Sequence, residues 1–219
     1  MRSKRHPRPA GRAVPKKVKK FVKSEIKRSA WNELAYKDTT QINQKISYDV
    51  PYVINLTATA DGTSASARQG NKILVNRIEG YLLLNLPSSS IGVPGFVKIV
   101  MLRSKDDVQP TWGSLFEATG VNSTDPFGPR NPKNEGKMKI MKTWNIELGN
   151  NTSTTYLDKN SRLIRFNKRF KTPLKVQYDG TASGDKAYGQ VYLIACSNRL
   201  DAATPPEFTH CSYRTWFQS

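Results

Sequence analysis

The sequence predicts an all-β protein, an eight-stranded antiparallel jelly-roll sandwich that follows a disordered, partly helical basic N-terminal arm. Three observations support this fold class. After about residue 40, apolar and polar residues alternate in most segments, which is the period of a half-buried strand. Loops rich in Gly, Pro, Ser and Asn separate these segments, without the strand–helix alternation of a parallel sheet. The first 30 residues hold twelve of the 35 Lys and Arg residues but one acid, Glu25.

The basic arm, residues 1–40, is expected to have two parts. Residues 1–13 contain Pro, Gly and Arg without periodicity, which predicts disorder. From about residue 15 to residue 30 a narrow apolar stripe recurs at helical spacing, formed by Val18, Phe21, Val22 and Ile26. Because the lysines between these residues repel one another, we expect this helix to form only where anions screen the charge and a surface receives the apolar edge.

Residues 41–219 are expected to form a single domain. Its predicted strands are 46–56, 72–86, 95–103, 137–148, 162–170, 174–178, 188–196 and 208–217. Pro51 indicates that the first of these is an edge strand, because proline donates no ladder hydrogen bond. A short helix is expected at 111–119 with Thr111 or Ser114 as its cap, and 60–71 and 120–136 read as loops. An immunoglobulin-like domain is usually shorter, and an OB-fold needs only five strands.

The sequence offers little material for catalysis or metal binding. His6 lies in the arm and His210 in the last strand, so a Ser-His-Asp arrangement lacks its histidine. Cys196 and Cys211 have no C-x-x-C partner, which predicts buried free thiols rather than a zinc site or a disulfide framework. We therefore expect no enzyme activity, no catalytic residue, no cofactor and no metal. The charged N-terminus has no apolar core of a signal peptide, so no membrane partner is expected.

The charge of the arm predicts nucleic-acid binding. Residues 1–30 have a net charge of +11, out of +18 for the chain, and clustered cations without a recognition pattern neutralise phosphates with little sequence preference. The candidate residues are Arg2, Lys4, Arg5, Arg8, Arg12, Lys16, Lys17, Lys19, Lys20, Lys23, Lys27 and Arg28. A nuclear localisation signal is also predicted, formed by Pro15, Lys16, Lys17, Lys19 and Lys20.

A second basic stretch lies within the domain, in the predicted strands 162–170 and 174–178. One face of the first strand carries Ile164, Phe166, Lys168 and Phe170, and the other face continues into Arg165, Asn167, Arg169 and Lys171. The first face is expected to pack, while the second forms a cationic ridge. This ridge faces either nucleic acid or the acids of a neighbouring subunit. We favour nucleic acid, with Arg165, Arg169 and Lys171 as the candidate residues.

Four segments of the chain resemble coat proteins of small icosahedral viruses, of the geminivirus-like, circovirus-like and satellite-necrosis types. They are VKIVMLRSKDDVQPTWGSLFEA (97–118), KMKIMKTWNIEL (137–148), RFNKRFKTPLKVQY (165–178) and GQVYLIACSN (189–198). The resemblance spans about residues 70–200. Circular single-stranded DNA viruses fit best, because of the import-like signal and the LIAC strand. The Cys/His cluster that many geminivirus proteins carry in their basic region is missing here.

This resemblance implies a capsid protein that assembles with copies of itself into an icosahedral shell of about 60 subunits. It implies a virion location, a genomic nucleic-acid partner (single-stranded DNA favoured, RNA possible), and a host nuclear import receptor with assembly in the nucleus. The alternative is a ribosomal or other monomeric nucleic-acid-binding protein with a basic tail. That class predicts basic residues spread over a compact body. A cupin-like enzyme would need a His-rich metal site, which two histidines cannot supply.

Overall fold

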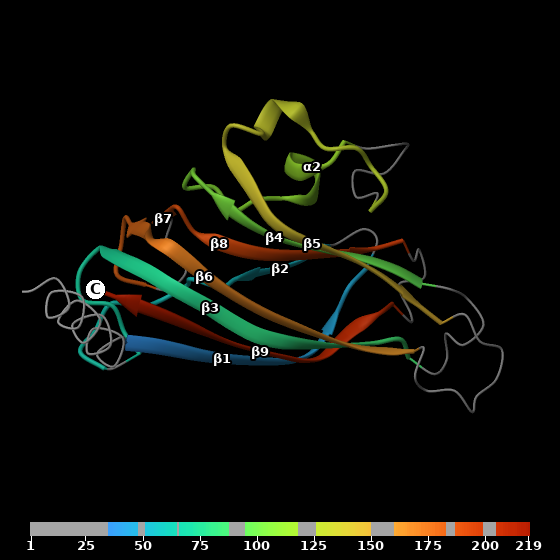
Figure 1. Cartoon of the computed structure of the whole chain (residues 1–219), viewed down its shortest axis with the longest axis horizontal. Helices are drawn as coiled ribbons and strands as arrows, with labels where there is room; N and C mark the ends of the chain where they lie inside the picture. Colours follow the sequence, from blue (N-terminus) through green and yellow to red (C-terminus); the bar gives the residue numbers. More distant parts are fainter. Residues whose placement is uncertain are drawn as a thin grey trace, which may run out of the picture. The chain divides into compact units, whose positions relative to one another are not determined.

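The computed structural model describes residues 35–47, 51–64, 66–87, 95–117, 126–149, 160–182, 187–198 and 205–219. These residues form two antiparallel sheets, which confirms the predicted all-β sandwich (Figure 1). The predictions for residues 1–34, which include the disorder, the conditional helix and the arm's binding residues, fall outside the described residues.

The strand order within the sheets is that of a jelly roll. The five-stranded sheet has the order β1 (Ala35–Lys45), β9 (Glu207–Gln218), β3 (Lys72–Asn85), β6 (Ser161–Tyr178), β7 (Ala187–Tyr188). The four-stranded sheet has the order β2 (Tyr52–Asn55), β8 (Val191–Ser197), β4 (Gly95–Ser104), β5 (Met138–Leu148). Each sheet thus places a strand from the end of the chain between two from its first half, a jelly-roll arrangement. Among the described residues, eight strands besides the two-residue β7 make up the sandwich.

Strand β1 was not among the strands predicted from the sequence. It begins at Ala35, so it takes in residues 35–40, which the sequence analysis assigned to the arm. Its inward side chains are not strongly apolar, which is why period-two patterning does not reveal it. Lys37 is half-buried and donates from Nζ to the Ala58 carbonyl at 2.6 Å, and burial lowers the pKa of this amine. Pairing with β9 over the length of the strand stabilises it instead.

Two further strands differ from their expected bounds. Among the described residues of the predicted strand 46–56, which leave out 48–50, Tyr52–Asn55 form β2; it is an edge strand, as Pro51 indicates. The predicted strands 162–170 and 174–178 are one continuous strand, β6. Between the pairs Arg77↔Arg169 and Val75↔Leu174, β3 has one residue while β6 has four, 170–173. This bulge accommodates Pro173, which has no N–H for the ladder.

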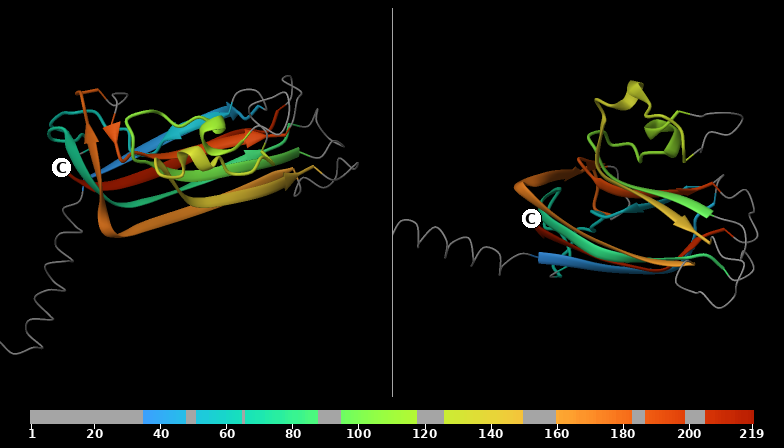
Figure 2. Two further views of the ribbon diagram at one scale, coloured as in Figure 1. Left: turned by 90° about the horizontal axis from the view of Figure 1, so that it is seen from above. Right: turned by 45° about the vertical axis from the view of Figure 1, so that its right-hand side comes forward.

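The hydrophobic core lies between the two sheets, and a second cluster lies on the other side of the four-stranded sheet. Figure 2 shows the layer that contains helix α2 (Trp112–Leu115) on that side of the sheet. In the second cluster Trp112 and Leu115 of α2 pack with Phe116 on side chains of β4 and β8. Thr111, one of the two predicted caps, caps α2 in a capping box with Ser114, but the helix ends at Leu115 and not at residue 119 as expected. Both faces of β8 are therefore covered, so all of its seven residues are buried. A 3-10 helix, η2 (Pro132–Asn134), follows in the same layer.

Candidate nucleic-acid interface

The face of the five-stranded sheet that points away from the core carries its side chains in four rows, set by the register of the strands. We call these sixteen residues the outer face. From the end where β1 begins, the rows read Tyr36–Trp216–Arg77–Arg169, Asp38–Arg214–Glu79–Asn167, Thr40–Ser212–Tyr81–Arg165 and Ile42–His210–Leu83–Leu163. Cations and aromatics thus gather on the first three rows and apolar side chains on the last.

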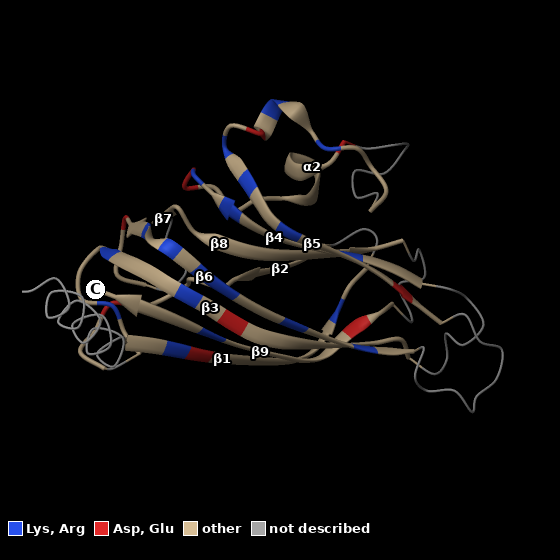
Figure 3. Ribbon diagram, viewed as in Figure 1, with Lys and Arg blue, Asp and Glu red and all other residues tan. Residues whose placement is uncertain are grey.

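Strand β6 supplies the cations predicted from the sequence. Ile164 and Phe166 are buried between the sheets, while Arg165, Arg169 and Lys171 are exposed. Lys168 is exposed as well, although it shares the phase of the buried residues. Lys and Arg recur along the whole strand (Figure 3). The geometry therefore leaves these cations accessible, and their contact with nucleic acid stays a prediction.

Two arginines of the outer face are engaged by acids. Arg214 donates to both carboxylate oxygens of Asp38, at 2.5 and 2.7 Å, and this hydrogen bonding lowers the pKa of Asp38. The Arg214 guanidinium also lies 4.4 Å from the ring centroid of Tyr36. Arg77 pairs with Glu79, which in turn accepts from the Trp216 indole at 3.1 Å. The Arg214–Asp38 pair is exposed and contributes little stability, whereas Arg77 and Glu79 are partly buried. Together the two pairs neutralise both acids of the outer face.

Arg165 and Arg169 form no ion pair with any residue that the structure describes. Arg165 sits directly opposite Tyr81 in the register of β3 and β6. Beside it, a shallow hollow of about 490 Å³ opens on the outer face. Its lining consists of Asp38, Glu79, Gly80, Tyr81, Arg165, Phe166, Asn167, Ser212, Tyr213 and Arg214. The hollow combines one unpaired guanidinium, a tyrosine ring and several hydrogen-bonding groups.

Gly80 creates the close approach of strands under this hollow. A Cβ at this position would lie 2.4 Å from the Ser212 carbonyl oxygen and 2.8 Å from Tyr213 Cα. Only glycine allows β3 and β9 to meet at this distance.

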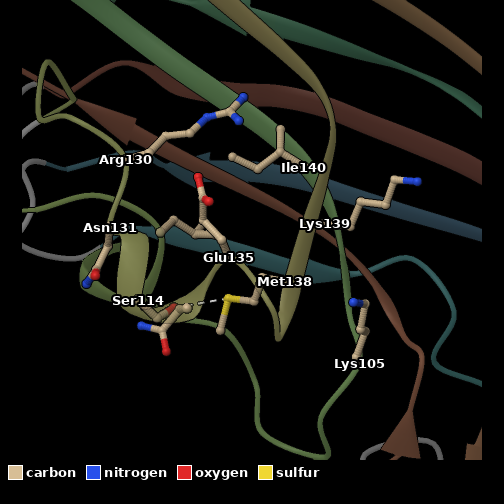
Figure 4. Close-up of a pocket in the computed structure, with 10 residues that line it drawn as sticks. Lys105, Ser114, Arg130, Asn131, Glu135, Met138, Lys139 and Ile140 are labelled. Carbon is tan, nitrogen blue, oxygen red and sulfur yellow. Dashed lines mark hydrogen bonds between the residues drawn. The ribbon is translucent and has the colours of Figure 1, made fainter.

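A second pocket, of about 340 Å³, lies between α2, η2 and β5 (Figure 4). It has mixed charge, with Lys105, Arg130 and Lys139 beside Glu135. Lys105 already donates to the Gly136 carbonyl at 2.8 Å, and Ser114 donates to the Met138 sulfur at 3.5 Å. No catalytic grouping results from these residues.

The two cysteines are buried, whereas His210 lies on the outer face. Cys196 and Cys211 are buried and belong to no disulfide, as predicted, and burial raises the pKa of Cys211 to about 12. His210 is half-buried on the outer face, where it contacts Tyr81. In the described ranges, no three His, Cys, Asp or Glu side chains gather as metal ligands would. The α-helix described here has four residues, and no described helix reaches the length that a bilayer requires.

Sequence reasoning missed most of the outer face. Arg77, Tyr81, Arg214 and Trp216 lie on strands that were predicted, but their convergence depends on the order β9–β3–β6, which a single sequence does not give. Apolar and polar residues alternate in 79–84 and 208–217, and this alternation indicates which residues of each strand share the outer side.

Comparison with known proteins found similarity at the level of structure alone. No protein-family model matches the chain, and no curated protein matches it. A chain from Desmodium yellow mottle tymovirus aligns with a TM-score of 0.38 and 8% identity, covering 99% of this chain and 93% of that chain. VP2 of the infectious bursal disease virus subviral particle aligns with a TM-score of 0.25 and 8% identity, over 83% and 32%.

The latent dimeric PorU of Porphyromonas gingivalis also aligns, with a TM-score of 0.34 and 6% identity over 84% of this chain and 13% of that one. Similarity this distant does not bear on function. The class to which the chain itself can be assigned is an antiparallel jelly-roll sandwich.

Proposed function

We propose that this chain is a viral capsid protein, which assembles with copies of itself into an icosahedral shell and packages the genome through its basic N-terminal arm. One observation carries the proposal. A segment with a net charge of +11 in 30 residues directly precedes a jelly-roll sandwich whose remaining 189 residues have a net charge of only +7. A polycation of this kind binds phosphates, while the sandwich provides the rigid building block.

The amount of charge suits the packaging of a small genome. A shell of about 60 copies would enclose about 660 positive charges, because each arm contributes +11. Partial neutralisation then accommodates on the order of 1000 nucleotides. A gene for 219 residues alone needs 657 nucleotides, at three per residue. The charge supply and the minimal genome length agree in scale.

Exposed apolar side chains supply surfaces for contacts between copies. Val108 and Phe127 are 60% and 61% exposed in the layer that covers the four-stranded sheet, and Tyr188 is 46% exposed on β7. Burial of these side chains against another copy would be favourable, by about 25 cal/mol per Å² of apolar area. Their positions on different sides of the sandwich suit an assembly with several neighbours.

We further propose single-stranded DNA as the packaged nucleic acid and the run Pro15–Lys20 as a signal for a host nuclear import receptor. Both follow from the basic arm and from the resemblance to coat proteins of circular single-stranded DNA viruses. A fusion of residues 1–30 to a fluorescent protein tests the signal. We expect the fusion to accumulate in the nucleus, and we expect this accumulation to be lost when four lysines are replaced by alanine: Lys16, Lys17, Lys19 and Lys20. A fusion with the original sequence that distributes like the fluorescent protein alone contradicts the proposed signal.

Negative-stain electron microscopy of the purified full-length protein tests the assembly. Uniform closed particles are expected. Nucleic acid should copurify with them, and digestion with a DNase or an RNase should identify it as DNA or RNA. The competing class, a monomeric nucleic-acid-binding protein with a basic tail, predicts a 24.6 kDa species at every salt concentration. Sedimentation that shows only this species, and with added oligonucleotide only its complex with that strand, contradicts the capsid proposal.

A further inference from the structure

We propose that the outer face of the five-stranded sheet binds single-stranded nucleic acid directly, with a base stacked on Tyr81 and the adjoining phosphate held by Arg165. This rests on the proposed function and deepens it, because it names a second contact with the packaged strand besides the arm.

Tyr81 and Arg165 project from one point of the sheet. They are directly opposed in the pairing of β3 with β6, so their side chains leave the same face within one interstrand spacing, about 5 Å. Tyr81 is 41% exposed. A ring and a cation that leave neighbouring strands on one face can contact a base and a phosphate of the same nucleic-acid strand.

His210 orients the Tyr81 ring from the neighbouring strand β9. The two rings are parallel to within 5°, with centroids 5.4 Å apart, and the Tyr81 hydroxyl lies 3.2 Å from His210 Nε2. Contact on one side reduces the conformational freedom that the ring would lose on binding. An aromatic ring held in this way is a stacking platform, the device with which sheets bind single strands without sequence preference.

The hollow between these groups is large enough for a nucleotide unit. Its volume of about 490 Å³ falls in the range of small-ligand sites. Asn167 and Ser212 add amide and hydroxyl groups to its rim. Beyond Tyr81, the last row continues with Ile42, Leu83 and Leu163, which are 58%, 36% and 51% exposed. These apolar side chains extend the surface that can cover the next base.

Charge favours nucleic acid over a second copy of the chain as the occupant. The four rows contain four arginines and two acids, Asp38 and Glu79, a net charge of +2. Both acids are paired, with Arg214 and Arg77, so Arg165 and Arg169 supply the uncompensated charge. A copy that presented the same face would set two positive surfaces against each other, whereas a phosphate backbone is complementary.

The test uses the full-length protein and two fluorescein-labelled strands of equal length, oligodeoxythymidylate and its abasic counterpart, with fluorescence anisotropy as the readout. Both strands offer the same phosphates, so their difference in affinity measures contacts to bases. We expect thymidylate to bind at least about fivefold more tightly, since stacking on one aromatic ring contributes that much. Tyr81→Ala should abolish the difference, and Tyr81→Phe should keep it.

Matched controls separate the site from general effects. Tyr188→Ala removes a tyrosine of similar exposure, 46% against 41%, from β7 and should leave the difference intact. Arg165→Gln should weaken the binding of both oligonucleotides by the same factor, because it removes a phosphate contact. Arg130→Gln, in the layer that contains α2, should leave both affinities unchanged. Photo-crosslinking of thymidylate to the unmodified protein, followed by mass spectrometry, should locate the crosslink in the peptides that hold Tyr81 or His210.

An unchanged preference for thymidylate in Tyr81→Ala, or crosslinks confined to the arm, overturns the proposal. So does a Tyr81→Ala variant that binds normally but assembles poorly in sedimentation, because the outer face would then be an interface between copies. The arm is tested separately by the salt dependence of binding, which Tyr81→Ala should leave unchanged. Failure of one proposal is therefore distinguishable from failure of the other.

Discussion

The guanidinium carbon of Arg68 lies 4.2 Å from the ring centroid of Tyr178, and both side chains are about 1% exposed. Arg68 donates to three backbone carbonyls, those of Thr59, Gly70 and Gly180. Among the described residues it forms no ion pair. The charge is thus stabilised by carbonyl dipoles and by the π face of Tyr178, and one side chain joins the loop 60–71 to the turn after β6.

Replacing Arg68 should be strongly destabilising. Arg68→Met would remove the donor from the buried Thr59 carbonyl, while the carbonyls of the exposed Gly70 and the half-buried Gly180 can turn to water. One buried acceptor left unpaired costs about 1–3 kcal/mol, so we expect a loss of that size in the free energy of unfolding. Arg68→Lys should lose nearly as much, because an ammonium group cannot reach three acceptors in a planar fork. Urea denaturation followed by circular dichroism measures this. The exposed Arg169→Met is the control, and a loss for Arg68→Met below about 1 kcal/mol contradicts the assignment.

Gly80→Ala tests the close approach of β3 and β9. The new methyl group would meet backbone atoms of Ser212 and Tyr213 at 2.4 and 2.8 Å, and backbone in the middle of a sheet cannot rotate away. We expect a loss of about 1–3 kcal/mol or more, or insoluble protein. Gly136→Ala is the matched control, since a Cβ there has nothing within 4 Å. Equal melting temperatures for the two variants would show that the strands can separate at no cost.

Stability should fall at alkaline pH. Burial raises the pKa of Cys211 from 9.0 to about 12 and those of Tyr178 and Tyr192 from 10.0 to about 12. Because these groups hold their protons more tightly in the folded state, their stabilising contribution is complete below pH 9 and is lost as pH rises from 9 towards 12.

Urea denaturation at a series of pH values between 8 and 11 checks the alkaline effect. Each such group adds up to about 1.4 kcal/mol per pH unit to the slope. Cys211→Ala removes one titrating group and should make the decline between pH 9 and 10 shallower, whatever its effect on stability at pH 8. A stability that is flat from pH 8 to pH 11 would mean that these side chains titrate normally in the folded protein.

The sequence predicts the sandwich well because its core strands carry strong period-two patterns. Ile164 and Phe166 against Arg165, or the continuous apolar run of β8, indicate which faces are covered. Strand β1 was missed because the polar residues Lys37, Thr39 and Gln41 occupy its inward positions, and its pairing with β9 depends on a strand far along the chain. Arg68 was missed for a related reason. The sequence of loop 60–71 predicts a solvent-exposed loop. The burial of Arg68 depends on carbonyls of Thr59 and of Gly180, which is 112 residues from Arg68 in the chain.

The residues of the candidate site likewise fall into those that the sequence could predict and those that depend on the fold. The cations of β6 follow from alternation within one strand, so the sequence could name Arg165 and Arg169. Their neighbours Tyr81 and His210 come from two other strands, and their contact is a consequence of sheet order. The residues of the arm were named from charge density alone, a property of composition that needs no fold.

The final prediction concerns that charge density. If the eleven net positive charges of residues 1–30 all engage a single strand, the logarithm of the binding constant should fall with the logarithm of salt concentration with a slope of about −8, from −0.7 per phosphate. Deleting residues 1–28 should leave a folded β domain with a much shallower slope. Fluorescence anisotropy against salt measures both slopes, and circular dichroism monitors the fold. A deletion variant that retains a slope near −8 would place the phosphate contacts on the sandwich, because counterion release counts the phosphates neutralised wherever the cations lie.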